Sequence, residues 1–314
     1  KSQQSLSSSD TPYTLGFRRF ARIALAQAGV VAANSYVEFH HKMEAQNVSN
    51  SGWNYNSTSS FITLQFWFRC STNQTFYAWV TSTDGTNKRF TFSFTASGNN
   101  VWTKVTKTIP GASGIQIDND NGEGFNVVIA PFYGTDYTGS VSLDTWVTKN
   151  DATHSPDYAS TWLTAGASTF DITGVQLEVG DTATSFEHRS FGDELARCQR
   201  YFYQYVDASL YGSGIAPLCV VIGYQNNNAF GTTEFPVTMR ATPTLVHVEG
   251  TGFFKILRNA GTGDLNALTL HNIGRNSAAI NAYNASSGTS IALDQAGLMQ
   301  TNNTSCRVGF NAEL

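Results

Sequence analysis

Hydrophobic and polar positions alternate with a period of two along much of the chain, which is the pattern of a β-strand with one buried face. The clearest case is the segment 61–69, where Ile62, Leu64, Phe66 and Phe68 all fall on one side. Successive side chains of a strand point to opposite faces of its sheet. These four residues are therefore predicted to point into a hydrophobic core.

Seven further segments between residues 16 and 188 have a strand-like pattern, at 17–25, 36–44, 76–83, 88–95, 102–109, 125–131 and 170–179. The first of these is equally consistent with a helix by periodicity alone. Asp84-Gly85 is a common hairpin turn, and a slip of the apolar phase near Gly174 predicts a β-bulge. Many short strands at regular spacing, with no convincing helix between them, predict a β-sandwich or jelly roll.

The segment 191–204 has a different pattern, which predicts a helix. Ser190 is a suitable N-cap, Asp193 and Glu194 fall in the first turn, and Arg197 comes late. This order of charges complements the helix dipole. We therefore predict one short helix that links two domains.

Weaker alternation returns after this helix, with strands predicted at 218–224, 232–237, 244–249, 253–257, 267–273, 278–283, 290–293 and 306–311. Because these strands are short, the second sandwich is expected to have a thin core and to gain burial by association with copies of itself. The predicted fold class is all-β. Its parts are a polar linker or docking tail at 1–15, a jelly-roll β-sandwich at 16–190, the linking helix, and a smaller β-sandwich at 205–314 that serves oligomerisation or forms a tip.

Composition and charge restrict the partners of this chain. It has 19 Lys and Arg against 23 Asp and Glu, a net charge of −4, which argues against nucleic acid because phosphate binding needs clustered positive charge. Charged residues make up only 13% of the chain, about half the usual share. No apolar run approaches the roughly 18 residues that span a membrane, so membrane insertion is not expected. The four cysteines form no CxxC motif, which argues against a zinc or redox site.

Three stretches carry a resemblance to a known family. They are FDITGVQLEVG with ATSFEHR at 170–180 and 183–189, GDELARCQRYF at 192–202, and FPVTMRATPT at 235–244. In this order they resemble tail-fibre and related virion proteins of bacteriophages, often phages of marine bacteria. In that family a jelly roll similar to carbohydrate-binding modules is followed by a helix and a C-terminal β domain. The chain departs from the usual pattern at Phe202, where a Tyr is common, and at Ser185, where a Pro is common.

The resemblance implies a structural virion protein, a tail-fibre or receptor-binding component that contacts a glycan of the host surface. Its implied partners are copies of itself in a homotrimer, other virion proteins, and the host glycan, and its location is the virion, with the tail favoured over the head. One alternative is a capsid-attached head fibre or decoration protein. A second alternative is a glycan-degrading tailspike.

The tailspike alternative requires two carboxylates across a cleft, about 5 Å or about 6.5–9.5 Å apart. Candidate acids are present, but the sequence does not pair them: Asp136, Asp144, Asp157, Asp171 and Glu178. No rung-like internal repeat is present either, whereas phage depolymerases are commonly long parallel β-helices. The chain is therefore expected not to be an enzyme.

Glycan binding requires aromatic faces that pack against the C–H face of a pyranose, with polar groups for the hydroxyls. The candidates on predicted loops or outward faces are Trp53, Trp79, Trp146, Trp162, Tyr133 and Tyr137. The alternative for Trp79 and Trp146 is that they only cover the sandwich.

A metal site has weaker support. Asp118, Asp120 and Glu123 lie in a DNDNGE run, but Gly122 stands at the fifth place, where the EF-hand loop needs Asp or Asn. A turn before the next strand is the simpler explanation. No cofactor is expected, and a structural calcium ion is the alternative.

Overall fold

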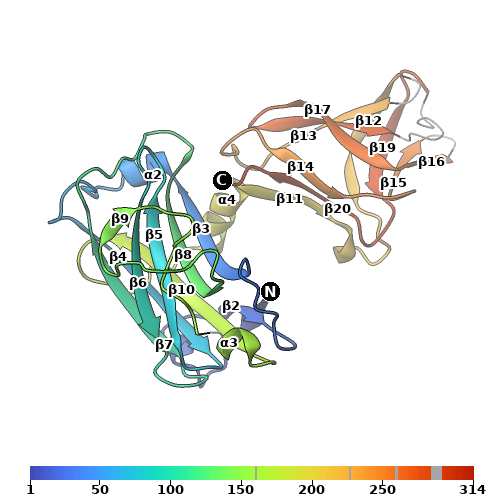
Figure 1. The fold of residues 1–314 in the computed structure, drawn as a ribbon. Helices are drawn as coiled ribbons and strands as arrows, with labels where there is room; N and C mark the ends of the chain where they lie inside the picture. The colour runs from blue at the N-terminus through green and yellow to red at the C-terminus, as the bar shows by residue number, and fades with distance from the viewer. Residues whose placement is uncertain (160, 226–227, 259–260, 284–291) are drawn as a thin grey trace. The chain divides into compact units, whose positions relative to one another are not determined.

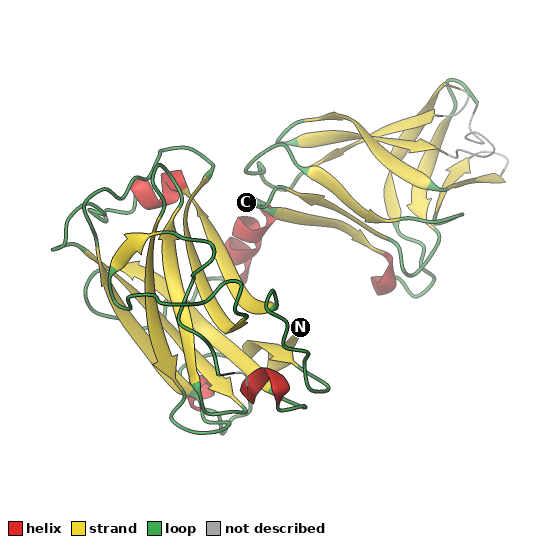
Figure 2. Cartoon of the chain, in the orientation of Figure 1, coloured by secondary structure: helices red, strands yellow, loops and turns green. Residues whose placement is uncertain are grey.

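The computed structural model describes residues 1–314 except 160, 226–227, 259–260 and 284–291. Its regular elements are mostly β-strands (Figure 2), so the predicted all-β fold class is confirmed. The chain divides into two compact units, Lys1–Glu187 and His188–Leu314, and each is described by itself. Within the described residues, no helix has the length and apolar character needed to cross a membrane.

The first unit contains two five-stranded antiparallel sheets (Figure 1). The first sheet has, in spatial order, β1 (Ser2–Ser5), β2 (Arg19–Ala24), β10 (Thr169–Val179), β4 (Phe61–Cys70) and β7 (Thr103–Pro110). The second sheet has β3 (Tyr36–Glu44), β8 (Glu123–Tyr133), β5 (Thr75–Ser82), β6 (Lys88–Thr95) and β9 (Trp146–Thr148). Three short helices, which the sequence did not predict, are α1 (Thr11–Thr14), α2 (Ala45–Ser49) and α3 (Thr161–Thr164).

The strand pairing of this unit is nested. β2 pairs with β10, β3 with β8, β4 with β7, and β5 with β6, all antiparallel. The outer pairs therefore enclose the inner ones in sequence, as in a long hairpin that is rolled across two sheets. This is the connectivity of a jelly roll, which confirms the predicted architecture.

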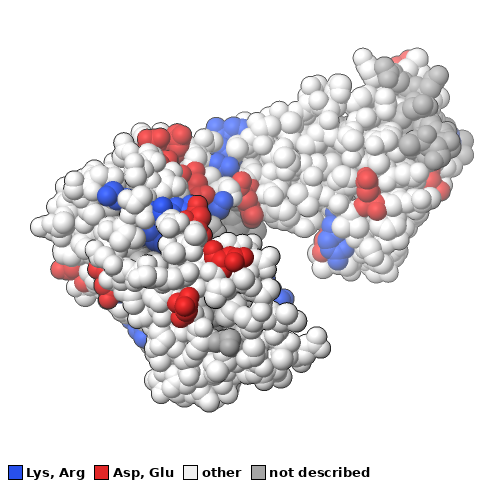
Figure 3. All heavy atoms as spheres, viewed as in Figure 1, with Lys and Arg blue, Asp and Glu red and all other residues white. Residues whose placement is uncertain are grey.

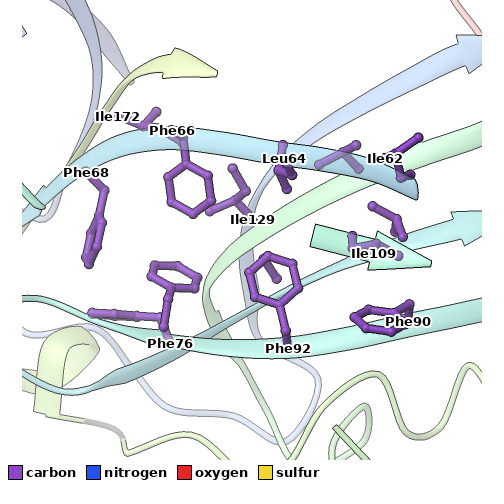
Figure 4. Packing of buried hydrophobic residues seen from close by; sticks show 14 of the residues in the cluster. Ile62, Leu64, Phe66, Phe68, Phe76, Phe90, Phe92, Ile109, Ile129 and Ile172 are labelled. Atoms are coloured by element: carbon purple, nitrogen blue, oxygen red, sulfur yellow. The ribbon is translucent and has the colours of Figure 1, made fainter. Parts of the chain in front are cut away.

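The core of the first unit lies between its two sheets. Ile62, Leu64, Phe66 and Phe68 of β4 are all buried, as their alternation predicted, and Figure 4 shows them among side chains of the opposite sheet. The Phe68 ring lies 4.9 Å from the ring of Phe94 in an edge-to-face arrangement. Burial of a phenylalanine side chain is worth about 1.5–3 kcal/mol, so this aromatic core is a large share of the unit's stabilisation.

The predicted bulge near Gly174 is confirmed. The register of β10 on β4 shifts between Thr173 and Gln176, and Gly174 has a φ of 61°. A Cβ atom at this position would lie 2.7 Å from the Phe17 ring. Glycine is therefore required both by the left-handed backbone and by the close approach of Phe17.

The N-terminal segment 1–15 differs from the predicted linker or docking tail. Residues Ser2–Ser5 form strand β1, which extends the first sheet by pairing with β2. Leu6 follows this strand and is buried in a small cluster with Phe17, Phe20 and Trp102. The Ser-rich composition concealed this strand, because one leucine is enough to anchor it once a sheet edge is available.

The second unit also contains two antiparallel sheets. The smaller has β11 (Phe202–Asp207), β20 (Arg307–Asn311) and β14 (Thr244–Val248) in that order. The larger has β16 (Gly261–Leu265), β15 (Phe254–Arg258), β19 (Ala296–Thr301), β12 (Pro217–Gln225), β13 (Asn228–Glu234), β18 (Ser277–Tyr283) and β17 (Ala267–Ile273). One buried cluster joins residues of both sheets, among them Val308 and Phe310 from the smaller and Phe254, Ile280 and Met299 from the larger.

The helix of the second unit is shorter than predicted. α4 spans Phe191–Gln199, with Ser190 as its N-cap accepting a hydrogen bond from the backbone of Asp193 at 3.2 Å. The expected helical residues 202–204 instead begin β11, because Tyr203 packs on Phe310 in the core. A short 3-10 helix, η1 (Ala208–Leu210), follows that strand.

Two strands of the larger sheet, β16 and β19, were not predicted. Both contain glycine and few β-branched residues, so their local pattern is weak. The strand predicted at 290–293 lies partly outside the described residues, and residues 292–293 are not in a strand.

Candidate functional site

Three of the six predicted glycan-binding aromatics are buried in the core of the first unit or packed against it. Trp53 and Trp162 are 3% and 0% exposed, and their indole N–H groups donate to the backbone oxygens of Ser60 and Thr169. Trp146 is half-buried and donates to the Pro110 oxygen at 2.7 Å. Trp53 lies in a loop, as predicted, and Trp162 lies in α3, but both rings are too buried to contact a ligand. The covering role considered for Trp146 agrees with its position.

The other three lie together on the outward face of the second sheet. The Trp79 ring is 5.2 Å from the Tyr133 ring, which is 5.8 Å from the Tyr137 ring. Trp79 is 2% exposed and Tyr133 7%, whereas Tyr137 is half-buried. Trp79 therefore forms the floor of this group, and Tyr137 is the predicted residue that reaches the surface.

Tyr36 completes the group, although the sequence did not single it out. It begins β3 and faces Tyr133 across the strand pair, with the two rings 5.5 Å apart. Its ring also meets Tyr137 at 5.9 Å and 89°, and the residue is 56% exposed. We call Tyr36, Tyr133 and Tyr137 the tyrosine patch. The patch forms because the register of β3 on β8 places Tyr36 opposite Tyr133. The sequence around Tyr36 does not contain that register, so it could not have identified this residue.

The loop that follows β8 places Tyr137 beside Tyr36. Gly134 donates its N–H to the Ser35 oxygen at 2.8 Å, and Asp136 donates to the Ala33 oxygen at 2.9 Å. A Cβ atom on Gly134 would come within 2.3 Å of the Ala33 oxygen, so this contact requires glycine. The loop is thus held against the chain that precedes β3, and the geometry of the patch is fixed by backbone hydrogen bonds.

A carboxylate lies next to the tyrosine patch. Glu38, on the same outward face of β3, accepts a hydrogen bond from the Tyr133 hydroxyl at 2.5 Å and lies 3.5 Å from the His40 ring nitrogen Nδ1. Burial raises the pKa of Glu38, but the hydrogen bonds from His40 and Tyr133 outweigh it, so the net pKa is lowered. Glu38 is therefore ionised at neutral pH and is an acceptor for hydroxyl groups.

Beneath the patch lie two more polar groups. The His154 ring packs on Trp79 and Tyr133 at 5.4 and 5.2 Å, and its Nδ1 is buried with no hydrogen-bond partner among the described residues. Burial, and next the charge of Arg89, lower the pKa of His154 to about 4. Arg89 is 2% exposed, and its guanidinium donates to the Asn150 oxygen at 3.1 Å. His154 is thus neutral at physiological pH.

The arrangement contains the kinds of group that contact a sugar ring. Tyr36 offers an exposed aromatic ring and Tyr137 a half-buried one, and Glu38 and the tyrosine hydroxyls offer hydrogen-bonding groups beside them. This is the combination that holds the apolar face and the hydroxyls of a pyranose.

The acidic turn at 118–123 uses its polar side chains to fix its own backbone. Asp84 accepts the N–H of Asp118 at 2.8 Å, and Asp120 accepts that of Gly122 at 2.8 Å. Glu123 pairs with Lys42 at 3.1 Å. The described residues contain no group of three His, Cys, Asp or Glu that could hold a metal ion, so the structural calcium stays a prediction.

Two of the candidate acids for hydrolysis already have strong partners. Asp171 is 0% exposed and accepts hydrogen bonds from Arg22 at 2.7 and 2.8 Å and from Arg69 at 2.9 and 3.0 Å. Glu178 accepts from Thr184 at 2.6 and 2.9 Å, and these bonds lower its pKa despite the opposing effect of burial. Both carboxylates stabilise the first sheet.

Comparison with known proteins gives few matches. No protein-family model matches this chain, and no curated protein does. Among solved structures, the crystal structure of Cucumber Necrosis Virus aligns at 10% sequence identity and a TM-score of 0.18, over 99% of this chain and 88% of that chain. So low a TM-score supports no conclusion about fold or function.

Proposed function

We propose that this chain is a structural, non-enzymatic bacteriophage virion protein, a tail-fibre or receptor-binding component that binds a host-surface glycan through its first unit. The resemblance of the three sequence motifs supports the virion assignment, with the tail favoured over the head. The tyrosine patch, with Glu38 beside it, supports the glycan-binding role.

The single observation that carries the proposal is the pairing of Tyr36 and Tyr137. Both side chains reach the surface, although most aromatic residues of this unit are buried. Their backbones are fixed by the β3–β8 register and by the loop contacts of Gly134. A preorganised aromatic surface loses little conformational entropy when a rigid sugar ring packs on it.

Binding of the full chain to host cells and to an array of bacterial surface glycans tests the proposal. Tyr36→Ala and Tyr137→Ala are each expected to weaken glycan binding about 10-fold or more, the usual effect of removing a stacking aromatic ring. Glu38→Gln is expected to weaken it less, because the amide still accepts one hydrogen bond.

Tyr211→Ala is the matched control, because Tyr211 is also an exposed tyrosine, at 43%, but lies in the second unit. This variant is expected to bind as the unaltered chain does. Binding that survives both patch variants would move the glycan site elsewhere. A chain that binds no host cell or glycan would instead be an architectural part of the virion, and release of reducing ends from a bound glycan would show an enzyme.

A further inference from the structure

The outward face of the seven-stranded sheet in the second unit carries an apolar surface that no described segment of this unit covers. On β12, Val220, Ile222 and Tyr224 are 66%, 55% and 63% exposed. Their neighbour Val221 points into the core, and Gly223 is buried. An antiparallel strand with one solvated face normally has polar residues on that face. Here both faces of the strand are apolar, so core formation explains only one of them.

The apolar surface continues across the neighbouring strands. Val220 lies opposite Leu298 of β19, which in turn lies opposite Leu257 of β15, and Leu257 is 47% exposed. On the other side, Ile222 lies opposite Phe230 of β13. We call these six side chains the apolar face: Val220, Ile222, Tyr224, Phe230, Leu257 and Leu298. Five of them form two cross-strand rows, and the Tyr224 ring lies 5.2 Å from the Phe230 ring, so the surface is contiguous rather than a set of scattered residues.

Charge is nearly absent from the middle of this face. The outward residues of β19, β12 and β13 that flank the apolar ones are uncharged, apart from Glu234 at the end of β13. Near one edge of the sheet, Lys255 of β15 lies opposite Asp264 of β16. The second unit as a whole has eight Lys and Arg and eight Asp and Glu. In the view of Figure 3, much of its surface is accordingly uncharged.

We propose that the apolar face is covered by the same unit of a second copy of this chain. A charged partner would have to bury its charges against an uncharged surface, whereas a second copy presents an equally uncharged one. A unit with balanced charge also has no net electrostatic repulsion from its own copies.

The size of the whole outward side of the sheet, with the apolar face in its middle strands, agrees with this occupant. Seven strands about 4.8 Å apart, each of about five to nine residues, give a face of roughly 30 by 20 Å. This is about 600 Å², of the same order as the ~800 Å² that each partner buries in a standard interface. The proposal deepens the self-association implied by the virion assignment, and it does not depend on glycan binding.

Measurement of the mass of the full chain in solution, by light scattering over a dilution series, tests the proposal. The unaltered chain is expected to form an assembly of two or three copies. Ile222→Lys is expected to weaken that assembly about 30-fold or more, because it places a charge at the centre of a buried apolar contact. A chain that is monomeric throughout the series would overturn the proposal.

Val246→Lys is the matched control, because Val246 is a 46% exposed strand residue of the smaller sheet in the same unit. It is expected to leave the assembly unchanged, and equal dissociation by both variants would refute a role for the apolar face. Circular dichroism and thermal unfolding check that Ile222→Lys is folded.

Side-chain footprinting with hydroxyl radicals provides a second measurement on the unaltered chain. Labelling of Tyr224 and Leu257 is expected to rise on dilution, while labelling of Tyr211 stays constant. Unchanged labelling of Tyr224 during dissociation would place the contact elsewhere. Glycan binding by Ile222→Lys, measured in parallel, separates this proposal from the function proposed for the first unit.

Discussion

The outward faces of the two units differ in what covers them. In the first unit, the segment 134–158 covers Trp79 and Tyr133 on the second sheet, and Thr91 donates to the oxygen of His154 in that segment at 2.9 Å. The outward face of its first sheet is covered by the N-terminal residues around Leu6 and by 180–187, where Gln65 donates to the Thr184 oxygen at 2.8 Å. The seven-stranded sheet of the second unit leaves its apolar face exposed. The jelly roll thus completes its own surface, whereas the second unit is completed by another molecule in our proposal.

The largest expected effect concerns the first unit, where a loop covers the outward face of the second sheet. Trp79→Ala removes a buried ring from beneath the loop 134–158 and leaves a cavity, so we expect a loss of about 3–4 kcal/mol in the free energy of unfolding of the first unit. Denaturant unfolding followed by tryptophan fluorescence measures it, because all six tryptophans lie in this unit and five remain. Tyr224→Ala, an exposed aromatic of the apolar face, is the control and should leave this transition unchanged. An effect below about 1 kcal/mol would show that the loop does not bury the ring.

The next effect concerns the buried carboxylate of the first sheet. Asp171→Ala removes the acceptor for both Arg22 and Arg69. We expect a loss of about 3 kcal/mol, because two partly buried guanidinium groups lose their counter-charge. The same fluorescence measurement applies, with Asp136→Ala as the control, since Asp136 is an exposed acid of the same unit. Equal stability of the two variants would mean that the Asp171 network contributes little.

A smaller effect is expected from pH. The pKa of His154 in the folded chain is about 4, lower than in an unfolded chain, where it is about 6.5. Below pH 6.5 the unfolded state binds the proton more readily, so the first unit should lose stability as pH falls from 6.5 to 4. The loss should reach about 1–2 kcal/mol, less than the full shift implies because the ring is only partly buried.

Unfolding of the chain and of His154→Gln at pH 7 and pH 4.5 measures this contribution. The variant should show the smaller difference between the two pH values. His271→Gln, an exposed histidine of the second unit, should retain the full difference in the first unit's transition. If His154→Gln retained the full difference too, another group would have to be responsible.

The smallest expected effect concerns the exposed apolar face of the second unit. Ile222→Ser should change the unfolding free energy of the dissociated second unit by less than about 0.5 kcal/mol, because the residue is exposed there. Its neighbour Val221 is 0% exposed, and Val221→Ser should cost about 2–3 kcal/mol. Calorimetry of protein dilute enough to be dissociated measures the unfolding of the second unit in each variant. Equal losses would mean that Ile222 is packed within its own unit.

Much of the jelly roll was predictable because its signals are local. The strand predicted at 88–95 matches β6, and the bulge at Gly174 follows from a phase slip that is visible in the sequence. Strands without alternation, such as β1 and β16, were missed because partner strands rather than their own side chains stabilise them. The candidate site was predicted only in part. Tyr133 and Tyr137 were identified by type, but Tyr36 joins them through the register of β3 on β8.

The sequence by itself determined the all-β class, the inward faces of the long strands and the poverty in charge, since these depend on composition and on a period of two. Only the tertiary structure decided which aromatic residues are buried and which apolar rows are uncovered. Trp79 and Tyr224 both lie in strands, in similar alternating patterns, and on outward faces. A loop more than 50 residues later in the chain covers Trp79, and no described segment of the same unit covers Tyr224. Burial depends on contacts between residues distant in sequence, and a local pattern does not contain them.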